Sequence, residues 1–124
     1  MVMHLPDSAR VAYARVVRAL VAAGYGVATN DAAAYFARTP PKPLDAAVTL
    51  TLSAAAVPAP TGGSDVTVSG VFTWFSVFTI MAQSLAQQMP VHNSGGPNTP
   101  SRRCWNELVR VAGLLAPGAP LAYR

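Results

Sequence analysis

The chain has 124 residues, of which 52% are hydrophobic and only 11% charged, and its formal net charge is +4. This length suits one domain with a single core. A single cysteine excludes an intrachain disulfide and a thiolate-rich metal site. The basic residues, eight Arg and one Lys, are scattered along the chain, and this disfavours a nucleic-acid-binding arm.

The N-terminal part of the chain predicts an amphipathic helix over residues 8–23. Asp7 or Ser8 can cap its first turn, and Gly24 supplies the left-handed residue that commonly follows a helix. Apolar residues recur on one side of the helical wheel, and three arginines gather on the other side: Arg10, Arg15 and Arg18. Such a face is typical of solvent exposure, with an acidic partner or a phosphate as the alternative.

A short helix, 31–37, and a long hairpin follow. Asn30 or Asp31 can begin the short helix, which the sequence TPPKP ends because proline disfavours helix. Apolar residues then alternate with threonine and serine, and this pattern predicts strands over 46–57 and 65–74 joined by a turn rich in Pro and Gly.

The hairpin predicted by these two strands needs partners along both edges, because an isolated hairpin is only marginally stable in water. The rest of the chain offers few extended segments. Val27–Thr29 and Leu121–Tyr123 are candidates, and both are short. The sequence therefore predicts that neighbouring molecules complete the sheet.

No Asp, Glu, Lys or Arg occurs from Val66 to Ser101. The first part of this stretch continues the second strand, and the later spacing of apolar residues predicts a hydrophobic helix over 75–89 that Pro90 ends. Insertion of the segment 70–89 into a membrane is the alternative. A bilayer crossing needs roughly 20 predominantly apolar residues, and this segment is interrupted by Thr, Ser and Gln.

The last predicted helix covers residues 100–115. Thr99 can cap it, and Pro100 is tolerated at its first position, where the missing N–H has no partner within the helix. Three charged residues lie on its polar side at spacings that permit ion pairs: Arg103, Glu107 and Arg110. Together the elements predict a single α+β domain over residues 1–124.

The candidates for chemistry are few. Cys104 and His92 could form a thiol nucleophile and its base, with Cys104 in the first turn of a helix, where the thiol pKa falls. A space-filling cysteine and an exposed loop histidine are the simpler interpretation. No acidic or histidine cluster has metal-ligand spacing, and no glycine-rich segment has the order of a phosphate-binding loop. We therefore expect no enzyme activity, no cofactor and no metal.

The scarcity of charge and the incomplete hairpin favour a small structural subunit that assembles with copies of itself or with other subunits. The interface is predicted at the uncharged aromatic stretch and the last helix: Val66, Val68, Phe72, Trp74, Phe75, Phe78 and Trp105. A helix, hairpin, helix order also occurs in small phage head, neck and tail proteins. By this analogy the particle would be a virion; otherwise a cytoplasmic location is expected. The membrane segment and the thiol enzyme are the two alternatives, and binding of nucleic acid is disfavoured.

Overall fold

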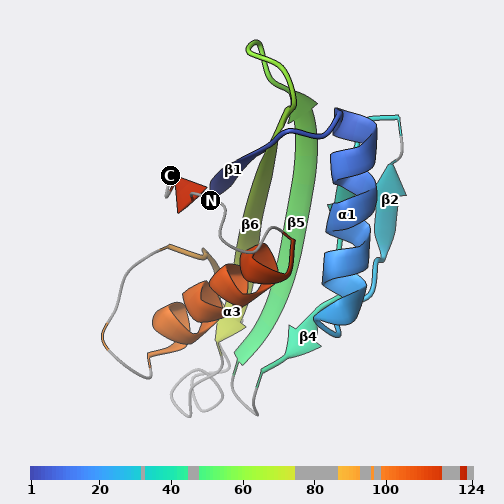
Figure 1. Cartoon of the computed structure of the whole chain (residues 1–124). Helices are drawn as coiled ribbons and strands as arrows, with labels where there is room; N and C mark the ends of the chain where they lie inside the picture. The colour runs from blue at the N-terminus through green and yellow to red at the C-terminus, as the bar shows by residue number, and fades with distance from the viewer. Residues whose placement is uncertain are drawn as a thin grey trace, which may run out of the picture.

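An antiparallel sheet with both described helices on one face makes the protein α+β, as the sequence predicted (Figure 1). The structure is a computed structural model, and it describes residues 1–31, 33–44, 48–74, 87–92, 96, 99–115 and 121–122. The elements, in chain order, are β1 (Val2–Leu5), α1 (Ala9–Ala22), β2 (Thr29–Asp31), β3 (Phe36–Arg38), β4 (Lys42–Pro43), β5 (Val48–Pro58), β6 (Ser64–Trp74), β7 (Gln87–Pro90), α3 (Pro100–Leu115) and β8 (Leu121–Ala122).

Strands β5 and β6 form the centre of the sheet, and they are paired along eleven residues from Val48 and Trp74 to Pro58 and Ser64. This confirms the hairpin, whose strands begin and end within two residues of the predicted bounds where the structure describes them. The strand order is β2-β3-β5-β6-β1-β8, with β4 also paired to β5 and β7 to β6. The hairpin therefore has strand partners on both sides within its own chain. The prediction that other molecules must complete its edges was wrong.

The missing partners come from short segments that carry no strand signal of their own. Met1 to Leu5 lies along β6, with Met3 opposite Val66, and the backbone of Met1 also bonds to Val68. Strand β8 overlaps the predicted segment Leu121–Tyr123 at Leu121 and Ala122 and pairs with β1. Strand β2 overlaps the other predicted segment at Thr29. The pairings of β1 with β6 and β8 join positions 59 to 120 residues apart in sequence, so local periodicity does not predict them.

The predicted helix over 31–37 was also wrong. The Asp31 carboxylate accepts hydrogen bonds from the backbone N–H of Ala33 and Ala34, both at 3.1 Å, and thereby holds a turn. Tyr35 has a φ of 51°, after which β3 pairs with β5. The alanine-rich sequence favours helix intrinsically, but pairing to an already formed sheet outweighs that small preference.

The two long helices agree with the prediction. Helix α1 begins after Ser8, whose side chain accepts a hydrogen bond from the Val11 N–H, and Gly24 follows it with a φ of 90°. Helix α3 begins after Thr99, whose hydroxyl oxygen accepts from the Arg102 N–H at 3.3 Å. The predicted helix over 75–89 lies outside the described residues up to 86, and its last three residues belong to β7 instead.

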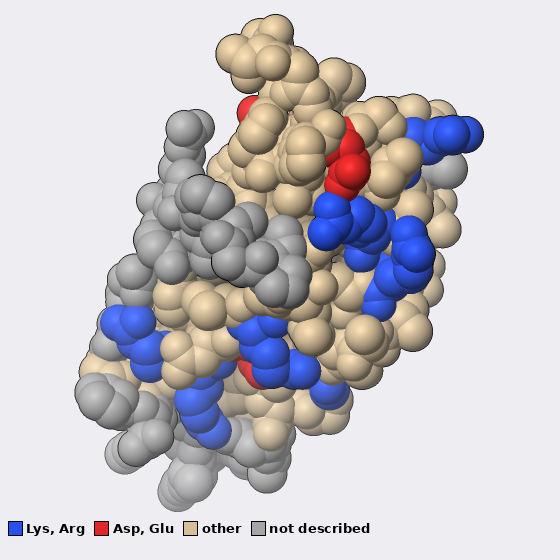
Figure 2. Space-filling view, in the orientation of Figure 1, with Lys and Arg blue, Asp and Glu red and all other residues tan. Residues whose placement is uncertain are grey.

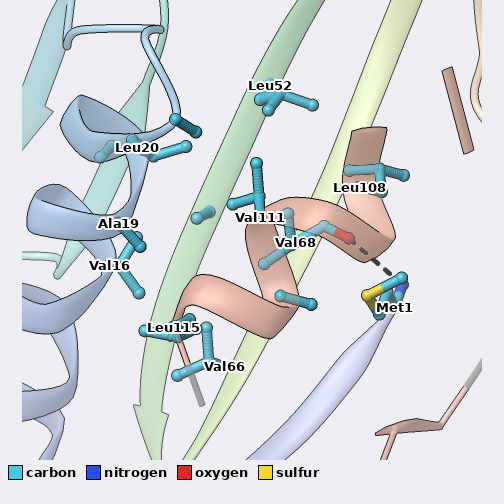
Figure 3. Close-up of a cluster of buried hydrophobic side chains, with 14 of the residues drawn as sticks. Met1, Val16, Ala19, Leu20, Leu52, Val66, Val68, Leu108, Val111 and Leu115 are labelled. Carbon is cyan, nitrogen blue, oxygen red and sulfur yellow. Dashed lines mark hydrogen bonds between the residues drawn. The ribbon is translucent and has the colours of Figure 1, made fainter. Parts of the chain in front are cut away.

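The core lies between the helices and the sheet. Alternate residues of β5 and β6 point toward α1 and α3, among them Leu52, Val66 and Val68, and Leu20 and Leu108 of the helices meet them (Figure 3). Each of these side chains is at most 1% exposed. The helices pack against one another as well as on the hairpin, so this side of the sheet is closed within one chain.

Candidate functional site

The residues predicted to form an interface divide into three groups. Four are buried in the core of one chain: Val66, Val68, Phe72 and Trp105. The backbone of Trp74 belongs to β6, where it pairs with β5 and β7. Phe75 and Phe78 lie outside the described residues. The four buried side chains offer no free surface to a partner, because the helices and the sheet already enclose them.

The face of the sheet that points away from the helices is a better candidate surface. We call it the outer face, and in the hairpin it comprises Thr49, Thr51, Ser53, Ala55, Val57, Asp65, Thr67, Ser69, Val71 and Thr73. These residues alternate with the core residues and are all half-buried or exposed. Neither α1 nor α3 packs on this face. The alternation in the sequence already indicated it, although the prediction placed the interface on the apolar side instead.

The outer face carries little charge. Ser53 lies opposite Ser69 at its centre and Thr49 opposite Thr73 near one end, so short hydroxyl side chains form cross-strand pairs on this face. Asp65 lies at one end, where its carboxylate is 3.0 Å from Nδ1 of His4 on β1. Both side chains of this pair are about half exposed. On the hairpin, the outer face is therefore polar, with Asp65 as its charged residue, and rich in stiff β-branched residues.

A polar cluster that the sequence did not predict joins the C-terminal end of α1 to α3 and β4. The Tyr25 hydroxyl donates to Oε1 of Glu107 at 2.7 Å, and Arg110 donates to both carboxylate oxygens of Glu107 at 2.9 Å. Arg110 and Lys42 also donate to the carbonyl of Ala23, at 3.1 and 3.4 Å. These bonds satisfy a carbonyl at the end of α1, where positive charge is favourable.

The electrostatics of this cluster fit a structural role. The hydrogen bond from Arg110 lowers the pKa of Glu107, against the opposing effect of burial. Burial is the largest cause that raises the pKa of Tyr25, and the bond to Glu107 adds to it. Tyr25 therefore remains protonated and donating at neutral pH, and Lys42 lies over its ring at 4.5 Å. The Glu107–Arg110 pair was predicted from spacing; the contact with Tyr25, 82 residues away, has no local signal.

Most of the basic residues that the structure describes belong to the two helices. Helices α1 and α3 together contain six arginines and one acidic residue, Glu107. Figure 2 shows this side, where Lys and Arg occupy far more of the surface than Asp and Glu. A groove lies here between α1 and the C-terminal end of α3. Charge and a hollow thus coincide on the side opposite the outer face.

The proposed thiol pair does not form a visible site. Cys104 is 0% exposed within α3, whereas His92 is exposed just beyond β7. A thiol without solvent access cannot reach a substrate unless the fold opens. Within the described residues no group of three or more His, Cys, Asp or Glu could hold a metal ion.

In the part of the chain that the structure describes, no helix has the length and apolar character needed to span a membrane. The segment 70–89, considered for insertion, begins in β6 and ends in β7.

Comparison with known proteins adds no relative. No protein-family model matches the chain, and no curated protein matches it significantly.

Proposed function

We propose that the protein is a small non-enzymatic subunit that assembles with copies of itself, and with other subunits, into a larger particle. The observation that supports this most strongly is the one-sided sheet. Its inner face is closed by α1 and α3, whereas the outer face has no described helix upon it. An open sheet face is compatible with water, but it also presents a broad, pre-formed surface for another protein.

A second copy of this chain is the occupant that fits the outer face best. In a two-fold symmetric contact the same surface meets itself, so it must tolerate its own charge. In the hairpin, the centre of the outer face contains Ser53, Ser69 and Thr51, none of them charged, and Arg38 of β3 lies opposite Ser53 on the same face. The hairpin residues at this centre therefore add no like-charge repulsion, and their short side chains permit close approach. A two-fold contact must also keep the two copies of Arg38 apart.

The outer face supplies a large part of the area that such a contact needs. Strands of eleven residues are about 36 Å long, and two neighbouring strands span about 10 Å, so the hairpin alone offers about 350 Å² of flat area. Strands β1, β3 and β7 extend this area on both sides. A standard interface takes roughly 800 Å² from each partner. The hairpin together with these three strands covers about 525 Å² in the plane of the sheet, or about two thirds of that area.

A virion component is the specific form of this proposal. Its support is the order of a helix, a hairpin and a C-terminal helix, together with a composition rich in Ala and in Arg over Lys. Small head, neck and tail proteins of phages share that order. The analogy is one of fold and composition, and function depends on the surface that the fold presents.

Light scattering coupled to size exclusion tests the proposal. We expect a mass of at least two chains of 12.9 kDa each. The double substitution Ser53→Arg with Ser69→Arg introduces four like charges into a two-fold contact on the outer face and should reduce the mass to one chain. The matched control is Asn106→Arg with Gly113→Arg, which adds the same charge at two exposed positions of α3.

A wild-type protein that is a soluble monomer at every concentration would contradict self-assembly. An assembly that survives the outer-face substitutions but dissociates with the α3 control would place the contact on the helix side instead.

A further inference from the structure

We propose that the groove between α1 and the C-terminal end of α3 binds an acidic amphipathic helix of a partner protein. The groove has a volume of about 460 Å³. Its lining comes from two helices: Val11, Arg15, Arg18, Ala19, Ala22, Leu114 and Leu115. We call it the α1–α3 groove.

The α1–α3 groove contains large apolar side chains that are more exposed than most others on the described surface. Val11 is 40% exposed, Val21 58% and Leu114 48%, and only one further large apolar residue among the described ones, Val57, is comparably exposed. Val11 and Leu114 stand on opposite helices of the groove, whereas Val21 lies on α1 outside the groove lining. Clustering of exposed apolar side chains along a hollow, rather than their mere presence, indicates an interaction site.

The α1 side of the groove contains two small residues, Ala19 and Ala22. Small side chains let the backbone of a second helix approach to the usual packing distance of about 8–10 Å. A helix seated there would place its own apolar residues between Val11 and Leu114. This is the arrangement by which amphipathic helices dock into hydrophobic grooves.

The charge of the groove selects an acidic partner. Helix α1 contains three arginines and no acidic residue. Arg15 pairs with Asp7 and donates to the carbonyl of Leu115 at 3.0 Å, so it ties the two helices together. Arg18 donates only to the carbonyl of Ala14 in its own helix, at 3.4 Å, and none of the described carboxylates pairs with it. Its guanidinium is available for a carboxylate of the partner.

A carboxylate-bearing helix fits these features better than a nucleic acid does. Binding along a phosphate backbone requires a row of available cations. Here one of the two arginines that line the groove is already neutralised, and the surface between them is apolar. An amphipathic helix can satisfy Arg18 and cover Val11 and Leu114 at once.

The α1–α3 groove lies on the helix side, opposite the outer face, so its occupation goes beyond self-assembly and does not depend on it. A monomeric chain could bind the helix, and an assembled one could do so on each subunit.

Fluorescence anisotropy with a labelled synthetic peptide tests the proposal. The probe is a helical peptide of about 18 residues, or 27 Å, built from Leu, Ala and Glu with one leucine stripe flanked by glutamates. The comparison probes are a scrambled peptide of the same composition, a peptide with Lys in place of Glu, and an oligothymidylate of about 20 nucleotides. We expect the acidic amphipathic peptide to bind at least ~10-fold more tightly than each of them.

Two variants locate the binding to the groove. Arg18→Glu and Leu114→Ser should each lower the affinity for the acidic peptide by ~10-fold. Both positions are on the surface, so circular dichroism should report an unchanged fold. Arg38→Glu on β3 is the matched control, because it changes the same charge at an exposed position of the sheet, and it should change the affinity less than ~2-fold. The mass measured by light scattering should be the same for Arg18→Glu and wild type.

The proposal is overturned if the acidic peptide does not bind, or binds no better than the scrambled or lysine peptide. It is equally overturned if Arg18→Glu leaves the affinity unchanged, or if the oligothymidylate binds more tightly than the peptide.

Discussion

The turn of the central hairpin supplies a sharp test of how β1 is fixed to the sheet. Gly63 has a φ of 70°, and a Cβ added there would lie 2.2 Å from the carbonyl oxygen of Leu5 and 3.1 Å from Cα of Pro6. Both are backbone atoms, so neither can move by a simple rotation of a side chain. Gly63→Ala therefore forces the end of β1 away from the turn.

Gly26 provides the control, because its φ is also 70° but a Cβ there meets nothing within 4 Å. A left-handed residue other than glycine costs roughly 1–2 kcal/mol, and this applies to both alanine variants. Overpacking that shifts backbone adds about 1–3 kcal/mol, and this applies to Gly63 alone. We expect Gly26→Ala to lower the free energy of unfolding by about 1–2 kcal/mol and Gly63→Ala by about 2–5 kcal/mol.

Urea unfolding followed by circular dichroism, at one protein concentration for all variants, measures this difference. The entropy that alanine removes from the unfolded chain is the same for both and cancels. Gly62→Ala is a second control within the same turn, since it too has open space around it. If Gly63→Ala and Gly26→Ala differ by less than about 0.5 kcal/mol, the end of β1 is not packed against the turn as described.

Two further predictions concern single side chains. The pKa of Glu107 is lowered in the folded state, so its ionised carboxylate stabilises the fold. This contribution to the free energy of unfolding is complete above pH 4.5, the ordinary pKa, and is lost as the pH falls through the lower pKa of the folded state. Glu107→Gln should lower the free energy of unfolding by about 1.5–3 kcal/mol at pH 7, and urea unfolding should show a smaller loss of stability between pH 5 and pH 3 than in the wild type. If the variant loses as much stability as the wild type over this pH range, the result contradicts the bond to Arg110. Cys104 should react with iodoacetamide far more slowly in the native protein than in denaturant. Rapid labelling of the native protein would instead support Cys104 as a reactive thiol.

Local patterns were sufficient for the two long helices and the hairpin. Ser8, Gly24 and Thr99 act at the helix ends through groups within a few residues, and the alternation of β5 and β6 reports which side chains face the core. In interactions of this kind both partners lie within a few residues of each other, so the local sequence is enough to predict them. The Glu107–Arg110 pair was predictable for the same reason.

Long-range pairing decided the rest. The segment 31–37 has the composition of a helix, but β5 offers it a strand partner, and β1 becomes a strand only because β6 lies beside it. The bond between Tyr25 and Glu107 likewise depends on how α1 and α3 meet.

By itself, the sequence determined that Val66, Val68, Phe72 and Trp105 would be buried, because their apolar surface must leave water. The hydrophobic effect has no direction, so the pattern could not distinguish burial inside one chain from burial against another. Only the tertiary structure decided this, by laying both helices over these residues and leaving the outer face and the α1–α3 groove exposed as the surfaces that we propose for partners.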